Sequence, residues 1–214
     1  MRLAERLTLI AIFSHARKDP ELQRRCVDFY LSHTDRINNW DLVDLSCYPL
    51  LGEWLLDKGR TLLYDLARDG KDIWEQRIGI VSTMTFIRHG QLDDTFAIAD
   101  ILLYHRHDLI QKAVGWLLRE AGKRDADRLR AFLDERCAVM PRTMLRYAIK
   151  RFPDDLRRHY LSLPRQKTKS QVAALRITDR AYRPICWTHM RVLGVFCTYR
   201  PRFWTHMHGW GDNS

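Results

Sequence analysis

The segment Gln111-Lys112-Ala113-Val114-Gly115 has two counterparts, Gln76-Arg77-Ile78-Gly79-Ile80 and Arg146-Tyr147-Ala148-Ile149-Lys150. The three segments are in register at a spacing of 35 residues, and each passes from polar or bulky residues to small or apolar ones. A unit of about this length with two helices is typical of HEAT- and armadillo-like solenoids, whose second helices line one concave face. The spacing predicts such a solenoid. Chance similarity among ten helices is the alternative.

Apolar residues at helical spacing predict helices throughout residues 1–160. Period-two runs and hairpin signals of the Asn-Gly or Asp-Gly kind are absent, so the predicted fold class is all-α, a HEAT/armadillo-like α-α superhelix. Pro49 is expected to kink or split the third helix. The expected helices cover residues 1–13, 20–31, 40–56, 62–66, 73–86, 95–104, 109–121, 126–133, 144–151 and 155–160.

The second expected helix has the clearest start. Asp19 is suited to the N-cap, and Pro20 to the first helical position, where a missing backbone N–H costs nothing. Its apolar positions follow the i, i+4, i+7, i+8 pattern and are expected to face the core: Leu22, Cys26, Phe29 and Tyr30.

The 214-residue chain has a net charge of +10, unevenly distributed. Residues 1–164 hold 27 Lys and Arg against 24 Asp and Glu, whereas residues 165–214 hold nine against two. Within the first part, residues 1–104 have 13 basic and 16 acidic side chains, and residues 105–164 have 14 and eight. A positive face is therefore expected to draw mainly on the later helices.

The C-terminal region lacks the helical pattern. We expect a domain over residues 1–163 and a basic tail over residues 164–214 that is disordered or loosely packed, although its aromatic residues are unusual for disorder. A zinc site is disfavoured because the candidate ligands match none of the usual spacings. These ligands are Cys186, His189, Cys197, His206 and His208.

The cellular setting is inferred from what the sequence lacks. No basic segment followed by an apolar run opens the chain, and no apolar stretch approaches the roughly 18–20 residues that a membrane span needs. The five cysteines are an odd number without close pairing, which suits free thiols in a reducing compartment. We expect a cytoplasmic protein, nucleoid-associated if bacterial, that is a monomer and does not bind a membrane.

The segment Asn39-Trp40-Asp41-Leu42-Val43-Asp44 carries the candidate site. Trp40 and Asp44 are four residues apart, so on a helix they share one face. An aromatic ring beside a carboxylate suggests a surface that receives a flat, positively charged group. The alternative is an ordinary helix start, with Asn38 or Asn39 as N-cap and acidic residues favouring the helix dipole.

Four segments together resemble the AlkD-like family of DNA alkylation repair enzymes, glycosylases built from HEAT-like repeats. They are residues 40–44 (Trp-Asp-Leu-Val-Asp), 73–77 (Ile-Trp-Glu-Gln-Arg), 110–120 (Ile-Gln-Lys-Ala-Val-Gly-Trp-Leu-Leu-Arg-Glu) and 146–150 (Arg-Tyr-Ala-Ile-Lys). Their order and separations, about 33, 35 and 35 residues, make the match specific over roughly residues 1–160. Members of the family normally carry further N-terminal helices, so this chain resembles an N-terminally shortened member.

The resemblance implies roles for six residues. Asp44 would be the catalytic carboxylate, and Trp40 and Trp116 would contact DNA. Arg77 would contact a phosphate, with help from Lys112 and Arg146 on the same repeat face. The partner would be double-stranded DNA containing alkylated bases, and no cofactor or metal is expected.

The chemistry of the lesion agrees with this resemblance. A purine alkylated at N3 or N7 is positively charged and leaves readily, so one carboxylate would suffice where neutral leaving groups need two. Asp44 would stabilise the oxocarbenium-like sugar and position the attacking water. The family is thought to act largely without a base-binding pocket, against the duplex surface. Two alternatives remain open, a non-catalytic HEAT-repeat scaffold that binds nucleic acid or protein, and an inactive truncated homologue.

Overall fold

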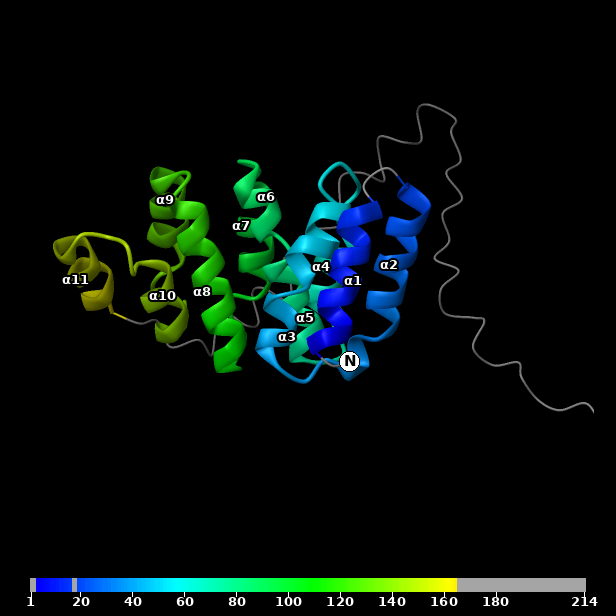
Figure 1. Cartoon of the computed structure of the whole chain (residues 1–214). Coiled ribbons are helices and arrows are strands. Elements are labelled where there is room, and N and C mark those ends of the chain that lie inside the picture. The colour runs from blue at the N-terminus through cyan, green and yellow to red at the C-terminus, as the bar shows by residue number, and fades with distance from the viewer. Residues whose placement is uncertain (1–2, 17–18, 165–214) are drawn as a thin grey trace, which may run out of the picture. The chain divides into compact units, whose positions relative to one another are not determined.

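The computed structural model describes residues 3–16 and 19–164, and within them the chain is helical and contains no strand (Figure 1). The chain divides after Gln166, and every described element belongs to the first unit. The α-helices are α1 (Leu3–His15), α2 (Pro20–Ser32), α3 (Trp40–Asp44), α4 (Thr61–Asp69), α5 (Ile73–Val81), α6 (Met84–Arg88), α7 (Asp93–Ile101), α8 (Asp108–Gly122), α9 (Ala126–Arg136), α10 (Arg142–Ala148) and α11 (Asp154–Ser162). The all-α prediction is confirmed.

The repeat is visible in the order in which the helices pack. Within the first unit, α5 packs against α3 and α8, and α8 packs in turn against α10, so these helices form one row. Helices α4 and α9 flank this row against α5 and α8, and α7 contacts α4, α5 and α8 (Figure 1). The three segments spaced by 35 residues fall on α5, α8 and the end of α10. The helical-repeat fold thus follows the register that the sequence shows.

Two of the three segments also share a partner. The Gln76 side-chain oxygen lies 2.9 Å from His105 Nε2, and the Gln111 amide donates to the His105 carbonyl at 3.0 Å. Both glutamines therefore lie beside the loop that leads into α8. The third segment lies on α10, which approaches α8 closely at Gly115. A Cβ added there would lie 2.4 Å from the Met144 carbonyl oxygen. The close contact between α8 and α10 depends on this missing side chain.

The predicted helix start at Asp19 is confirmed. Its carboxylate accepts a hydrogen bond from the Leu22 N–H at 3.0 Å, and Pro20 occupies the first helical position. The apolar set of this helix is only partly correct, because Phe29 is 47% exposed while Val27 is buried. Phe29 instead stacks on His33, with the ring centroids 4.2 Å apart.

Two expected long helices are divided. The expected helix over residues 40–56 ends at Asp44, and a π-helical turn (Tyr48–Gly52) follows around Pro49, as the proline predicts. The expected helix over residues 73–86 divides at Ser82 and Thr83. Their hydroxyl groups donate to the carbonyls of Ile78 and Ile80, both at 2.7 Å, and such bonds compete with the helical ladder.

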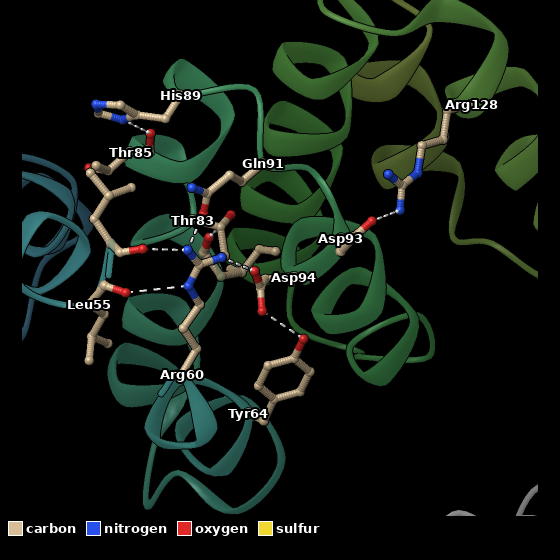
Figure 2. A network of polar contacts seen from close by, with 12 residues as sticks. Leu55, Arg60, Tyr64, Thr83, Thr85, His89, Gln91, Asp93, Asp94 and Arg128 are labelled. Carbon is tan, nitrogen blue, oxygen red and sulfur yellow. Dashed lines mark hydrogen bonds and ion pairs between the residues drawn. The ribbon is translucent and has the colours of Figure 1, made fainter. Parts of the chain in front are cut away.

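A polar network fastens α4 to α7 (Figure 2). Arg60 pairs with Asp94, which also accepts a hydrogen bond from the Tyr64 hydroxyl at 2.9 Å. The Arg60 guanidinium donates to the carbonyls of Leu55 and Leu56 as well, and it lies over the buried Phe86 ring at 3.8 Å. This cluster is one of several Arg–Asp pairs between neighbouring repeats.

Two further expectations concern membrane-spanning helices and the C-terminal tail. No helix among the described residues is long and apolar enough to cross a membrane. The basic tail, including the disfavoured zinc ligands, lies outside the described residues apart from Pro164. Cys26, Cys47 and Cys137 are free and buried.

Candidate active site

Trp40 and Asp44 are the first and last residues of the short helix α3. Asn39 caps the helix, with its side-chain oxygen 3.4 Å from the Asp41 nitrogen, so the helix-start interpretation of this segment is correct for Asn39. The cap does not explain Trp40, whose side chain is 50% exposed although tryptophan usually buries most of its surface. The first turn of α3 therefore presents a bare aromatic surface.

Asp44 is held by Arg77 from the neighbouring helix α5. Arg77 Nε donates to Asp44 Oδ1 at 2.8 Å and Arg77 Nη2 to Oδ2 at 2.7 Å, the two-pronged geometry in which arginine binds carboxylates most strongly. The remaining terminal nitrogen, Nη1, donates to the Leu109 carbonyl at 2.6 Å, at the start of α8. Three helices of the row, α3, α5 and α8, thus meet at one guanidinium.

The two charged side chains differ in their access to solvent. The Arg77 side chain is only 6% exposed, whereas the Asp44 side chain is 15% exposed. Among the described residues, Asp44 accepts hydrogen bonds from Arg77 alone. A carboxylate offers about four acceptor sites, so the site leaves part of Asp44 free to face a ligand.

Burial raises the pKa of the Asp44 carboxyl above its ordinary value, and Asp41 acts in the same direction. Arg77 opposes this effect through its hydrogen bonds and its charge. The balance gives a carboxylate poorly solvated by water and dependent on one buried cation for its ionised form. Such a group interacts more strongly with a developing positive charge than a solvated carboxylate does.

Lys112 and Trp116 lie on α8, one turn apart and on one face. Lys112 forms an ion pair with Asp108 at 2.5 Å. Trp116 is half-buried and lines a surface cavity with residues of α6 and of the far end of α8. The Trp116 Cα is about 10 Å along the helix from that of Leu109, at 1.5 Å per residue.

Arg146 lies on α10 and is exposed, next to Tyr147, which is 37% exposed. The structure therefore brings Trp40, Asp44 and Arg77 into one cluster and places Lys112, Trp116 and Arg146 on the next two helices of the row.

The structure assigns Arg77 partners other than the phosphate that the resemblance implied. All three of its nitrogens donate to protein acceptors, and the side chain is buried. Two of its five N–H groups remain unused, but the side chain is only 6% exposed. The geometry supports a positioning role for Arg77, because the guanidinium fixes the orientation and ionised form of Asp44, and the phosphate contact stays a prediction.

The Leu109 carbonyl cannot be predicted from the sequence, since a main-chain acceptor carries no residue-type signal. His105 is a second residue of the site without a recognisable sequence signal. The His107 backbone N–H donates to His105 Nδ1 at 3.1 Å, and Gln76 binds the other ring nitrogen. His105 therefore orders the loop that delivers Leu109. Its position 29 residues after Gln76 gives no pattern that sequence reasoning recognises.

The site contains no metal-binding arrangement. Across residues 3–16 and 19–164, no group of three or more His, Cys, Asp or Glu side chains is placed to hold a metal ion.

The protein is thus a helical-repeat protein whose α3 presents a tryptophan and, one turn later, a partly exposed aspartate. An arginine on the neighbouring helix α5 is buried against that aspartate. The model of the DNA alkylation repair enzyme family matches residues 4–152, and the chain belongs to this family. The AlkD-like resemblance is thereby confirmed. No curated protein matches the chain. Membership implies that the protein binds DNA and acts in the repair of alkylation damage.

Proposed function

We propose that this protein is a DNA glycosylase that excises positively charged N3- or N7-alkylated purines from duplex DNA. The observation that carries the proposal is the partly exposed Asp44 carboxylate, oriented by a buried arginine and one turn from the bare Trp40 ring. A protein that only grips phosphates gains nothing from a carboxylate on its DNA face, because the carboxylate repels the backbone.

The reaction proceeds by cleavage of the bond between the sugar C1′ and the purine nitrogen. The bonding electrons leave with the base, which becomes neutral, and the sugar acquires oxocarbenium character. Ionised Asp44 stabilises that charge, and its free acceptor site orients the water that attacks C1′. Water adds to C1′ and loses a proton to solvent, which leaves an abasic site.

The tryptophans supply surface for the damaged nucleotide. Trp40 lies on the same helical face as Asp44, so a nucleotide packed against its ring has its sugar near the carboxylate. Trp116 extends this aromatic surface on α8, and Lys112 and Arg146 add positive charge on the adjacent helices. Stacking of a base on an aromatic side chain is typically worth ~1–3 kcal/mol.

The test is release of 7-methylguanine from a methylated duplex by the purified chain under single-turnover conditions. Asp44→Asn preserves size but removes the charge, and it should slow excision by about 10²–10³-fold, as loss of one electrostatic stabiliser does. Duplex affinity should stay equal or become tighter, since a repulsive charge is removed.

Asp94→Asn is the matched control, because Asp94 is also a partly buried aspartate paired with an arginine. It should excise at the parent rate. Equal slowing in both variants would identify a folding effect and contradict the catalytic role of Asp44. A parent chain that binds duplex DNA without releasing base would favour an inactive homologue, and one that ignores DNA would favour a protein-binding scaffold.

A further inference from the structure

We infer that the surface cavity beside Trp116 is a second DNA subsite, separate from Asp44, that holds a backbone phosphate and its deoxyribose. The inference takes duplex DNA as partner from the proposed function, and otherwise rests on the cavity alone. The cavity has a volume of about 470 Å³. Its lining comes from α6, α8 and the turn after α8: Met84, Ile87, Arg88, Trp116, Glu120, Lys123 and Arg124.

The residues that line the cavity have a net positive charge, and only some of the cations are paired with a carboxylate. Glu120 is neutralised by Arg119 at 3.1 Å and by Lys123 at 2.5 Å. Arg88 and Arg124 are exposed, and neither has a carboxylate partner within the described part of the chain. Three cations against one carboxylate leave the cavity with a net charge of +2. An anion is the ligand that this wall attracts.

The Arg124 side chain contacts the backbone of Arg88. Arg124 Nη2 donates to the Arg88 carbonyl at 3.3 Å, which holds the Arg124 side chain beside the end of α6. Arg88 is held over the Tyr48 ring at 4.7 Å, a contact that leaves its N–H groups available for a ligand. A phosphate bound by both residues would accept charge-assisted hydrogen bonds from each guanidinium.

The floor of the cavity is apolar. Met84 is 7% and Ile87 2% exposed, and the half-buried Trp116 forms one side. A sugar–phosphate unit has a matching division, because the deoxyribose ring offers carbon and the phosphate offers charge. A free inorganic anion would use only the arginines and would leave this floor uncovered.

The distance along α8 separates the cavity from the catalytic cluster. Trp116 and Lys123 are seven and 14 residues beyond Leu109. These intervals correspond to about 10 and 21 Å of helix at 1.5 Å per residue. On a strand that runs along α8 and advances about 3.4 Å per phosphate, these intervals span roughly three to six nucleotides. On that path the arginines of the subsite bind backbone beyond the damaged nucleotide, which Trp116 contacts in the proposed function.

The experiment measures binding of the full chain to an unmodified duplex across a salt series. The Arg88→Gln/Arg124→Gln double variant should lower the slope of log K against log[salt] by about one unit, the loss of one phosphate contact. The Arg24→Gln/Arg130→Gln control removes two exposed cations that are paired along α2 and α9, and it should change the slope by less than half as much. Equal slopes for the double variant and the parent overturn the subsite, as does an equal loss in the control.

Glu120→Gln tests the same cavity in the opposite direction. It removes the one carboxylate of the lining and releases Lys123, so the duplex should bind more tightly and with a steeper salt slope. Weaker binding would contradict the inference. Melting temperatures of all variants, compared with the parent, show whether the fold is intact.

Two further comparisons separate the possible outcomes. Inorganic phosphate titrated into the parent chain by calorimetry should show no saturable binding. Saturable binding that the double variant loses, with an unchanged DNA slope, would reassign the cavity to a free anion and overturn the inference. Because unmodified duplex requires no chemistry, a flattened salt slope with no release of 7-methylguanine would refute only the proposed glycosylase. Excision with unchanged slopes would refute only the subsite.

Discussion

Two Arg–Asp pairs join neighbouring repeats, and they differ in what else surrounds the carboxylate. Asp44 and Arg77 are 33 residues apart in sequence, and Arg60 and Asp94 are 34 apart. Asp94 accepts from both Arg60 and the Tyr64 hydroxyl (Figure 2). Among the described residues, Asp44 accepts from Arg77 alone. The Arg60–Asp94 pair is closed by a second donor, and the Asp44–Arg77 pair is left open.

The nearby rings differ in the same sense. Phe86 is fully buried beneath Arg60, while Trp40 is half exposed beside Asp44. One inter-repeat interaction thus serves in one place to fasten helices and in another to present a carboxylate next to an apolar surface. Fold and site use the same chemistry, and the number of remaining partners decides which role it takes.

The largest expected effect comes from removing each arginine. Arg77→Met leaves Asp44 buried without a partner and should lower the free energy of unfolding by about 3–5 kcal/mol. Arg60→Met should cost less, about 1–3 kcal/mol, because Asp94 keeps the Tyr64 hydroxyl. Urea unfolding followed by circular dichroism measures both. Equal losses would show that the open and closed pairs do not differ energetically.

A smaller effect is expected from the ring beside the open pair. Trp40→Ala should weaken binding to methylated duplex by ~1–3 kcal/mol, the usual contribution of one stacked base, with little change in stability because the ring is 50% exposed. Phe29→Ala is the control, since Phe29 is 47% exposed on α2. If both substitutions weakened binding equally, Trp40 would have no special place in the site.

The smallest effect is a displacement of the pH profile. In the proposed reaction excision requires ionised Asp44, and burial raises the pKa of this carboxyl, so activity should fall on acidification at a pH above the ordinary aspartate value of 3.8. Arg77→Lys retains the charge but loses the two-pronged bonds, and it should move this acidic limb to higher pH. Single-turnover rates from pH 4 to 8 test this, and an unmoved limb would argue against Arg77 acting through Asp44.

The same shift has a consequence for stability with a definite sign. Because the pKa of Asp44 is higher in the folded protein than in the unfolded chain, ionisation costs more in the folded state. Its contribution to stability is present below the unfolded pKa and is lost as pH rises through the folded pKa. Asp44→Asn should therefore remove a decline in stability just above pH 3.8. Urea midpoints at several pH values give the measurement, and a parent whose stability rises across this window because of Asp44 would contradict it.

The repeat could be predicted from the sequence because its signals are local. Segments that recur at a spacing of 35 residues, and an N-cap such as Asp19, can be recognised from residue type alone. The division of the helix at Ser82 could not be predicted from the sequence, because a serine hydroxyl can either donate to a carbonyl of the preceding turn or face water. Phe29 was misplaced because helical spacing allows two adjacent faces to be apolar and only tertiary packing selects one.

The candidate site shows the same limit. The four-residue spacing of Trp40 and Asp44 predicts that they share one helical face, and the family match covers both residues. That Arg77 is buried against Asp44 depends on how α3, α5 and α8 meet. No one-dimensional pattern encodes such a meeting point, so the sequence identified the arginine but not its protein partners, and its phosphate contact stays a prediction.

The acceptor supplied by Leu109 has an evolutionary consequence. Because this partner of Arg77 is a main-chain oxygen, it is present whatever amino acid occupies position 109. Substitutions at that codon therefore leave one bond of the site chemically intact, and selection acts there only on packing. A saturation scan should report position 109 as permissive while insertions that change the start of α8 are not tolerated. Part of this site is thus inherited through the placement of a helix rather than through the identity of a residue.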